Sequence, residues 1–88
     1  MNSSVGDKTK EVGAKGVRFV DEMLVIELDD DRELSLPFTK IKELEWLVTA
    51  TPEQKAHWQI EPYGYAIWWP EFDDGIEVVH ALSLQPVT

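Results

Sequence analysis

The sequence predicts an α+β fold: an N-terminal three-stranded antiparallel meander, two short helices, then a C-terminal β-hairpin and a short terminal segment. Three observations predict it. Apolar segments with a two-residue period, separated by tight turn signals, occupy the first half. A capping box with proline at the first helical position lies in the middle. Downstream, a glycine turn and a closing proline bracket an apolar run.

The 88 residues are expected to form one domain, which we assign to residues 17–88. Residues 1–16 are rich in serine, glycine and lysine and have no periodic apolar positions. We expect them to form a disordered tail.

The first three strands are predicted at residues 17–20, 23–28 and 32–36. The turns between them, Asp21-Glu22 and residues 29–31, are too short for crossovers, so the strands pair in an antiparallel meander. In the second strand Met23, Val25 and Glu27 face away from the side that carries Leu24, Ile26 and Leu28. Residues 29–31 are all aspartate, but they lack the spacing, glycine and terminal glutamate of a calcium loop, which favours a solvated turn.

A helix is predicted at residues 40–48, with Thr39 as its N-cap. Trp46 lies about 140° around the helical wheel from Ile41, so it either makes a second contact or is exposed. The apolar stripe of this helix consists of Ile41, Leu44, Leu47 and Val48.

A second short helix is predicted at residues 52–57, because Thr51, Pro52 and Gln54 match the capping box. The hairpin follows at residues 58–62 and 66–69. Period two places Ile67 and Trp69 on one face and Ala66 and Trp68 on the other. Residues 76–78 read as strand, while residues 79–84 fit either strand or helix.

One stretch resembles a known family, the bacterial domain of unknown function 2442. The similarity covers roughly residues 17–82, including the opening hairpin at residues 17–37. This chain has Ala66, Trp68 and Gly75 where that family usually has glycine, histidine and an acidic residue. The motif residues that carry the resemblance are Ala50, Thr51, Pro52, Glu53, Gln54, Trp58, Ile67, Trp69, Pro70, Glu71, Phe72, Asp73, Asp74, Ile76 and Val78.

The resemblance implies a compact α+β domain. It also implies that some relatives are similar to partners in toxin–antitoxin-like gene pairs, and that some carry an added DNA-binding helical domain. We expect this chain to be too short for that added domain.

Charge is the most uneven property of the sequence. Residues 17–88 carry five basic and fifteen acidic side chains, a net charge of −10, and residues 1–16 carry +1, which together give −9. Because nucleic-acid affinity comes largely from neutralising phosphates, direct binding of DNA or RNA is not expected. The acidic surface serves either solubility or a basic partner.

The chain has no cysteine, which excludes disulfides and thiolate chemistry. No apolar run is long enough for a membrane helix, and the first residues lack the apolar core of a signal peptide. We therefore expect a cytoplasmic protein that does not bind membranes.

Four large apolar side chains fall outside the predicted core, which we expect to consist of Phe19, Leu24, Ile26, Leu44, Trp58 and Trp69. So small a domain is not expected to bury all four, and exposed tryptophan and methionine are typical of a protein contact. The alternative is that the short helices and the C-terminal segment cover them. The predicted interaction surface consists of Trp46, Trp68, Met23 and Val25.

A competing ligand site is formed by Glu71, Asp73, Asp74 and His80. Carboxylates and a histidine suit acid–base chemistry, but a structural role in the bend after Pro70 is the alternative. His57 is expected at the C-terminal end of the second helix, where it interacts with the helix dipole. No spacing predicts a metal site, a cofactor or a nucleophile motif.

The sequence therefore favours a non-enzymatic acidic interaction module that either self-associates or pairs with a basic protein, in the manner of an antitoxin. The alternative is a small ligand-binding or hydrolytic domain built on the ligand site above.

Overall fold

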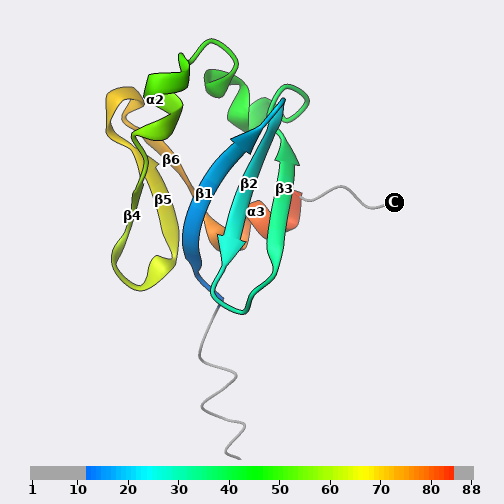
Figure 1. Ribbon diagram of the computed structural model, residues 1–88, viewed down its shortest axis with the longest axis vertical. Coiled ribbons are helices and arrows are strands. Elements are labelled where there is room, and N and C mark those ends of the chain that lie inside the picture. The colour runs from blue at the N-terminus through cyan, green and yellow to red at the C-terminus, as the bar shows by residue number, and fades with distance from the viewer. Residues whose placement is uncertain (1–11, 85–88) are drawn as a thin grey trace, which may run out of the picture.

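The computed structural model describes residues 12–84 and contains two three-stranded antiparallel sheets joined by short helices (Figure 1). Sheet A has the strand order β1-β2-β3 and sheet B the order β4-β5-β6. The predicted α+β class, with its N-terminal meander, is confirmed.

Sheet A consists of β1 (Ala14–Val20), β2 (Met23–Leu28) and β3 (Glu33–Pro37). Val20 pairs with Met23 across the two-residue turn, where Asp21 has a positive φ of 53°. The first strand begins at Ala14 rather than at Val17, because Ala14 pairs with Leu28 and is buried. Residues 1–11 of the expected tail lie outside the described residues.

The first helix is shorter and tighter than predicted: η1 (Lys42–Leu47) is a 3₁₀ helix. Its preceding residue, Ile41, is extended, and Thr39 does not cap it; the Thr39 hydroxyl instead donates to Glu22 Oε1 at 3.4 Å. A 3₁₀ helix has three residues per turn, so Leu44 and Leu47 align on the buried side. Val48 does not lie on that side and is 49% exposed, so its predicted place on the apolar stripe is wrong.

The helix α2 (Pro52–Ala56) follows the predicted capping box. The Gln54 amide donates to the Thr51 hydroxyl at 3.1 Å, and the Gln54 side chain accepts from the Thr51 amide at 2.9 Å. Two amides that the short helix leaves without an intrahelical partner are thereby satisfied.

Replacing Thr51 with alanine removes the side-chain acceptor of this box. We expect the free energy of unfolding to fall by about 1 kcal/mol, the usual value for an N-cap. Urea denaturation of Thr51→Ala measures the change, and Thr49→Ala, at an exposed residue outside the box, is the matched control. Equal midpoints for the two variants would contradict a stabilising role for the cap.

Sheet B consists of β4 (Gln59–Ile60), β5 (Ala66–Trp69) and β6 (Asp74–Glu77). The 3₁₀ turns η2 (Pro62–Gly64) and η3 (Pro70–Phe72) connect them. The predicted hairpin is present and β6 extends it to three strands. Residues 79–84 are helical, which decides between the two alternatives. The helix α3 (Val78–Leu84) already begins at Val78, which was predicted as strand, and it buries Val78 and Ala81 one turn apart.

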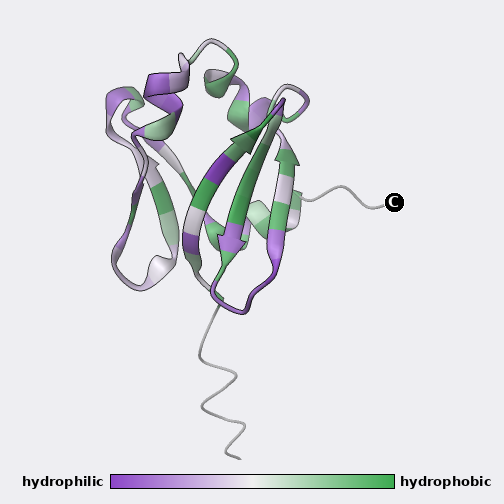
Figure 2. Cartoon of the chain, in the orientation of Figure 1, coloured by the Kyte–Doolittle hydropathy of each residue, from purple (hydrophilic) through white to green (hydrophobic). Residues whose placement is uncertain are grey.

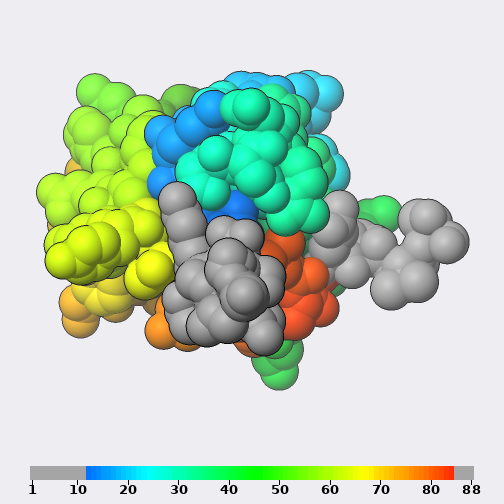
Figure 3. All heavy atoms as spheres, turned by 90° about the horizontal axis from the view of Figure 1, so that it is seen from below, coloured from blue at the N-terminus to red at the C-terminus, as the bar shows by residue number. Residues whose placement is uncertain are grey.

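The inner faces of both sheets share one core. The helices η1 and α2 lie across one end (Figure 1). At the opposite end, seen in Figure 3, the start of β1 lies against the turn η2. The helix α3 contacts both β3 and β6. Figure 2 shows the apolar residues concentrated along the strands and polar ones along the loops. Of the predicted core, Leu24, Ile26, Leu44 and Trp69 are fully buried, while Phe19 and Trp58 pack at its edge.

Among residues 12–84, no helix has the length and apolar character that crossing a membrane requires.

Candidate functional site

The four residues of the predicted interaction surface do not form one surface. Trp46 belongs to the edge of the core: its ring packs edge-on against Trp69 at 5.3 Å and lies 5.4 Å from Phe72. Its indole N–H donates to the Glu43 carbonyl at 3.0 Å. Trp46 therefore makes the second contact that the sequence left open, and it does not lie on an exposed interaction surface. In a 3₁₀ helix it still lies about 120° from the side of Leu44 and Leu47. Trp69 and Phe72 cover it there.

Val25 is only 4% exposed, so its predicted place on a contact surface is also wrong. It lies at the centre of the outer face of sheet A, between Arg18 on β1 and Ser35 on β3. Arg18 reaches across this face to Glu27 and Glu33, each at 2.9 Å, and its stem helps to cover Val25. Its hydrogen bonds lower the pKa of the Glu33 carboxyl.

Met23 lies on the same outer face and is half-buried. It stands in a row with Val20 and Pro37, its partners on the two neighbouring strands. Val20 is 45% exposed, so this row is an apolar patch of only three side chains. A stable interface needs about 800 Å² on each partner, far more than such a row supplies.

Trp68 lies on the outer face of sheet B, as the two-residue period predicts. It pairs with Gln59 on β4 and with Gly75 on β6. The next row contains Ala66, which pairs with Glu77 on β6. On the other side, the Glu61 amide donates to the Ala66 carbonyl at 2.9 Å and so brings Glu61 beside Ala66.

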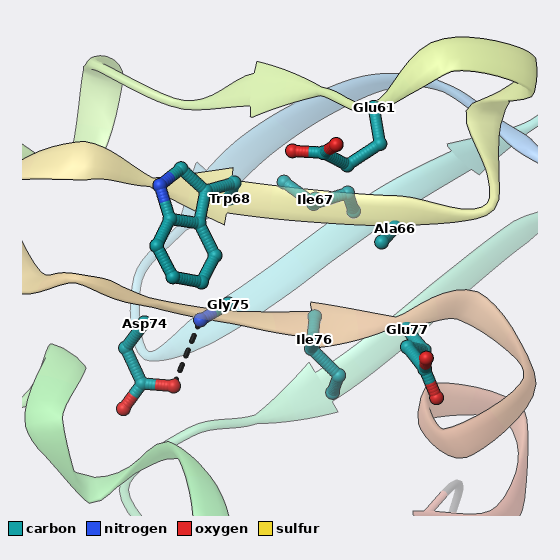
Figure 4. A pocket seen from close by; sticks show the side chains of 8 residues that line it. All are labelled: Glu61, Ala66, Ile67, Trp68, Asp74, Gly75, Ile76 and Glu77. Atoms are coloured by element: carbon teal, nitrogen blue, oxygen red, sulfur yellow. Dashed lines mark hydrogen bonds between the residues drawn. The ribbon is translucent and has the colours of Figure 1, made fainter.

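A shallow pocket of about 540 Å³ forms around these two rows. Ala66 leaves room because its side chain is small, the backbone of Gly75 forms part of the floor, and Trp68 forms one wall (Figure 4). Glu61 and Glu77 lie on opposite sides of Ala66, and the Cα atoms of such flanking strands are about 10 Å apart. The pocket therefore combines an aromatic wall with carboxylates at its rim; we call it the Trp68 pocket.

Asp74 also lines the Trp68 pocket, together with Ile67 and Ile76. Its carboxylate accepts a hydrogen bond from the Gly75 amide at 2.8 Å (Figure 4). The neighbouring Asp73 adopts a left-handed conformation, with φ 52°, that ends η3. The Asp74 carboxylate thus has the structural role considered from the sequence, and Asp73 contributes to the bend after Pro70 through its backbone conformation.

The structure does not bring the alternative ligand site together. Glu71 bonds to His57 Nδ1 at 2.5 Å, and His80 Nε2 lies 4.0 Å from Glu43 on η1. The strand β6 separates Asp74 from Val78, at the start of α3, by about 13 Å. The carboxylates and His80 therefore contact different neighbours and do not converge on one site.

Residues 12–84 contain no group of three or more histidine or acidic side chains that could hold a metal ion. In the aspartate turn, each carboxylate has its own neighbour. Asp29 accepts from the Gly13 amide, Asp30 from Arg32, and Asp31 from Lys15.

Sequence reasoning identified Trp68 but missed the residues around it, Glu61, Ala66, Gly75 and Glu77. The signal that could have found them is the hairpin register, because Glu61 and Ala66 follow directly from pairing residues 58–62 with 66–69. Gly75 and Glu77 required knowing that residues 74–77 form a third strand.

These features define a small acidic α+β domain in which two three-stranded sheets share a core and the second sheet exposes an aromatic, carboxylate-rimmed pocket. The chain belongs to the family described as protein of unknown function DUF2442, whose model matches residues 14–79. The resemblance stated from the sequence is thereby confirmed. Comparison with curated proteins gives no significant match.

Two solved structures share the fold. A protein of unknown function from Rhodospirillum rubrum has a TM-score of 0.69 at 18% identity, with 89% of this chain and 93% of that one covered. An uncharacterised protein from Chromobacterium violaceum has a TM-score of 0.68 at 18% identity, with 97% of this chain and 76% of that one covered. At this identity the likeness concerns the fold alone.

Proposed function

We propose that this protein is a non-enzymatic interaction module whose Trp68 pocket receives a basic side chain from a partner protein. The observation that carries the proposal is the combination, in one pocket, of the Trp68 indole with the carboxylates of Glu61, Asp74 and Glu77.

The distribution of charge supports a basic partner. No lysine or arginine follows Lys55, while that part of the chain contains five acidic residues, namely Glu61, Glu71, Asp73, Asp74 and Glu77. In sheet A, by contrast, Arg18 pairs with Glu27 and Glu33. The carboxylates around the Trp68 pocket therefore have no basic side chain nearby in sequence to neutralise them.

The chemistry of the pocket suits a lysine or arginine side chain. A cation beside an indole gains about 0.5–2 kcal/mol, depending on how far it is desolvated. Between Glu61 and Glu77 such a cation would also meet a carboxylate on either side of Ala66. The small Ala66 side chain leaves the space that the incoming group needs.

The same charges favour a different partner over a second copy of the chain. Two copies with a net charge of −9 each repel one another, and the repulsion is strongest where acidic faces meet. Of the two kinds of interaction that the sequence suggests, pairing with a basic protein therefore fits this pocket better than self-association.

A titration with an arginine- and lysine-containing glycine peptide tests the proposal. We expect the double variant Glu61→Gln/Glu77→Gln to bind the peptide about tenfold more weakly, which corresponds to 1.4 kcal/mol. The matched control is Glu45→Gln/Glu53→Gln, which removes the same charge from exposed residues outside the pocket. Trp68→Ala should weaken binding as well.

Calorimetry at low and at moderate salt gives the affinities, since exposed ion pairs weaken as salt rises. Equal affinities for the two double variants would mean that the peptide responds only to net charge. That result, or a parent protein that does not bind the peptide, would reject the Trp68 pocket as the site.

A further inference from the structure

Among the residues that the structure describes, the strand β1 has no hydrogen-bonded neighbour on the side away from β2, where β4 lies close to part of it. Val20, Arg18 and Gly16 pair with Met23, Val25 and Glu27 on β2. In a hairpin with a two-residue turn, the residues that flank the turn form a hydrogen-bonded pair, and such pairs then alternate. The backbone N–H and C=O groups of the intervening residues, Val17 and Phe19, therefore point away from β2.

These outward groups have no hydrogen-bond partner within residues 12–84. Val17 is only 8% exposed, so its amide and carbonyl have limited access to water. Buried backbone groups are nearly always paired, because leaving one unpaired costs about 1–3 kcal/mol. The edge thus presents donors and acceptors at the spacing of a β-ladder.

A groove of about 300 Å³ runs along this edge. Its walls are largely apolar, and no acidic residue lines it. Val17, Arg18 and Phe19 form one side, and Pro52, Lys55, Ala56 and Trp58 form the other.

Lys55 supplies the free positive charge of the groove. Its ammonium lies 4.9 Å from the centre of the Phe38 ring and 5.6 Å from that of Phe19. Within the described part of the chain it forms no salt bridge, whereas the Arg18 guanidinium is held by Glu27 and Glu33. In a chain of net charge −9, this groove is therefore suited to an acidic group.

We infer that the β1 edge binds a short extended segment of a partner protein that carries a carboxylate, by addition of a strand. The segment would exchange backbone hydrogen bonds with Val17 and Phe19, as in other cases of strand addition. One of its side chains would lie between Phe19 and Trp58, and its carboxylate would meet Lys55. Residues 17–19 border the groove, which limits the paired segment to about three residues, or 10 Å.

This inference is independent of the Trp68 pocket. The two sites have opposite charge and no residue in common, since the Trp68 pocket lies on the outer face of sheet B. Either can fail without affecting the other.

Amide hydrogen exchange tests the inference, with an acetylated and amidated peptide of alternating valine and glutamate as the probe. In the free protein the amides of Val17 and Phe19, which have no hydrogen-bond partner among residues 12–84, should exchange faster than the bonded amide of Arg18. Saturating peptide should slow exchange at Val17 and Phe19 by at least about tenfold, as a protected ladder position requires.

Three matched controls define the binding mode. A peptide with N-methyl groups on alternate residues should not protect the two amides, because it lacks the donors. A peptide with lysine in place of glutamate should bind at least about tenfold more weakly, the cost of 1.4 kcal/mol of lost charge pairing. The variant Ala56→Arg, at an exposed residue of α2, should fill the groove and abolish protection without unfolding the protein.

Failure of the peptide to protect Val17 and Phe19 would overturn the inference. So would equal protection by the N-methylated peptide, which would show binding without strand pairing. Protection in the free protein that increases with protein concentration would assign the edge to a second copy of the chain instead.

Discussion

Replacing Trp69 with alanine should lower the free energy of unfolding by about 3–5 kcal/mol, the range for removing a large aromatic side chain from a core. Trp69 is fully buried and its ring packs against Trp46 at 5.3 Å and Phe19 at 6.3 Å. Its indole N–H also donates to the Lys55 carbonyl at 3.0 Å, which ties α2 to sheet B. Since an 88-residue domain is stable by only about 4–13 kcal/mol, the loss is a large part of the total.

Urea denaturation followed by circular dichroism measures this loss. Trp69→Phe retains an aromatic ring but leaves the Lys55 carbonyl without its donor, so we expect a smaller loss of about 1–3 kcal/mol. Trp46→Ala, at a half-buried residue on the edge of the core, should also lose less free energy of unfolding than Trp69→Ala. A loss under about 1 kcal/mol for Trp69→Ala would contradict the central place of this side chain.

Replacing Gly75 with alanine should destabilise the protein by about 1–3 kcal/mol or more, as overpacking does. A Cβ atom at Gly75 would lie 2.2 Å from the Ile67 carbonyl oxygen and 2.9 Å from the Trp68 ring. The oxygen belongs to the backbone of β5 and cannot turn away, so β5 and β6 must separate locally. The same shift deforms the Trp68 pocket, which both strands line.

Thermal and urea denaturation of Gly75→Ala test this expectation, with Glu77→Ala, at an exposed residue of the same strand, as the control. The double variant Gly75→Ala/Trp68→Ala separates the two clashes. Because the shorter contact is with the Ile67 backbone, removing the Trp68 ring should restore little of the lost stability. Full recovery in the double variant would show that the ring alone requires glycine here, and unchanged stability in Gly75→Ala would contradict the close approach of β5 and β6.

Local chemistry made parts of this fold predictable. The meander could be assigned because its turns are short and its strands alternate, so that Leu24 and Ile26 had to share one buried face. The helix α2 could be assigned because Thr51 and Gln54 satisfy its first amides within a few residues of one another. In each case the determining contacts lie close together in the sequence.

Predictions that depended on distant contacts were less successful. The helix before α2 was expected to be α-helical, but η1 is 3₁₀, and this change turned Val48 toward solvent. Trp46 is covered because Trp69 and Phe72, which are distant in sequence, pack against it. Val25 was expected on an open face, yet its cross-strand neighbours cover it. Period alone shows which way a side chain points and does not show what covers it.

The composition of the Trp68 pocket was the least predictable feature. Trp68 could be assigned to an outer face from its spacing, but Glu61 and Glu77 are brought to opposite sides of Ala66 only when β4, β5 and β6 pair in register. The groove beside β1 likewise depends on α2 and Trp58 folding back along a strand more than thirty residues earlier in the chain.

By itself, therefore, the sequence determined the fold class, the meander, the capped helix, the family and the acidic character of the chain. These properties follow from backbone preferences and side-chain period, which act over a few residues, and from net charge, which is a sum over all residues. Only the tertiary structure decided that Trp46 and Val25 are covered, which strand edge is unpaired and which carboxylates surround Trp68. Those features arise from contacts between segments far apart in the chain, and burial depends on all the neighbours of a residue at once.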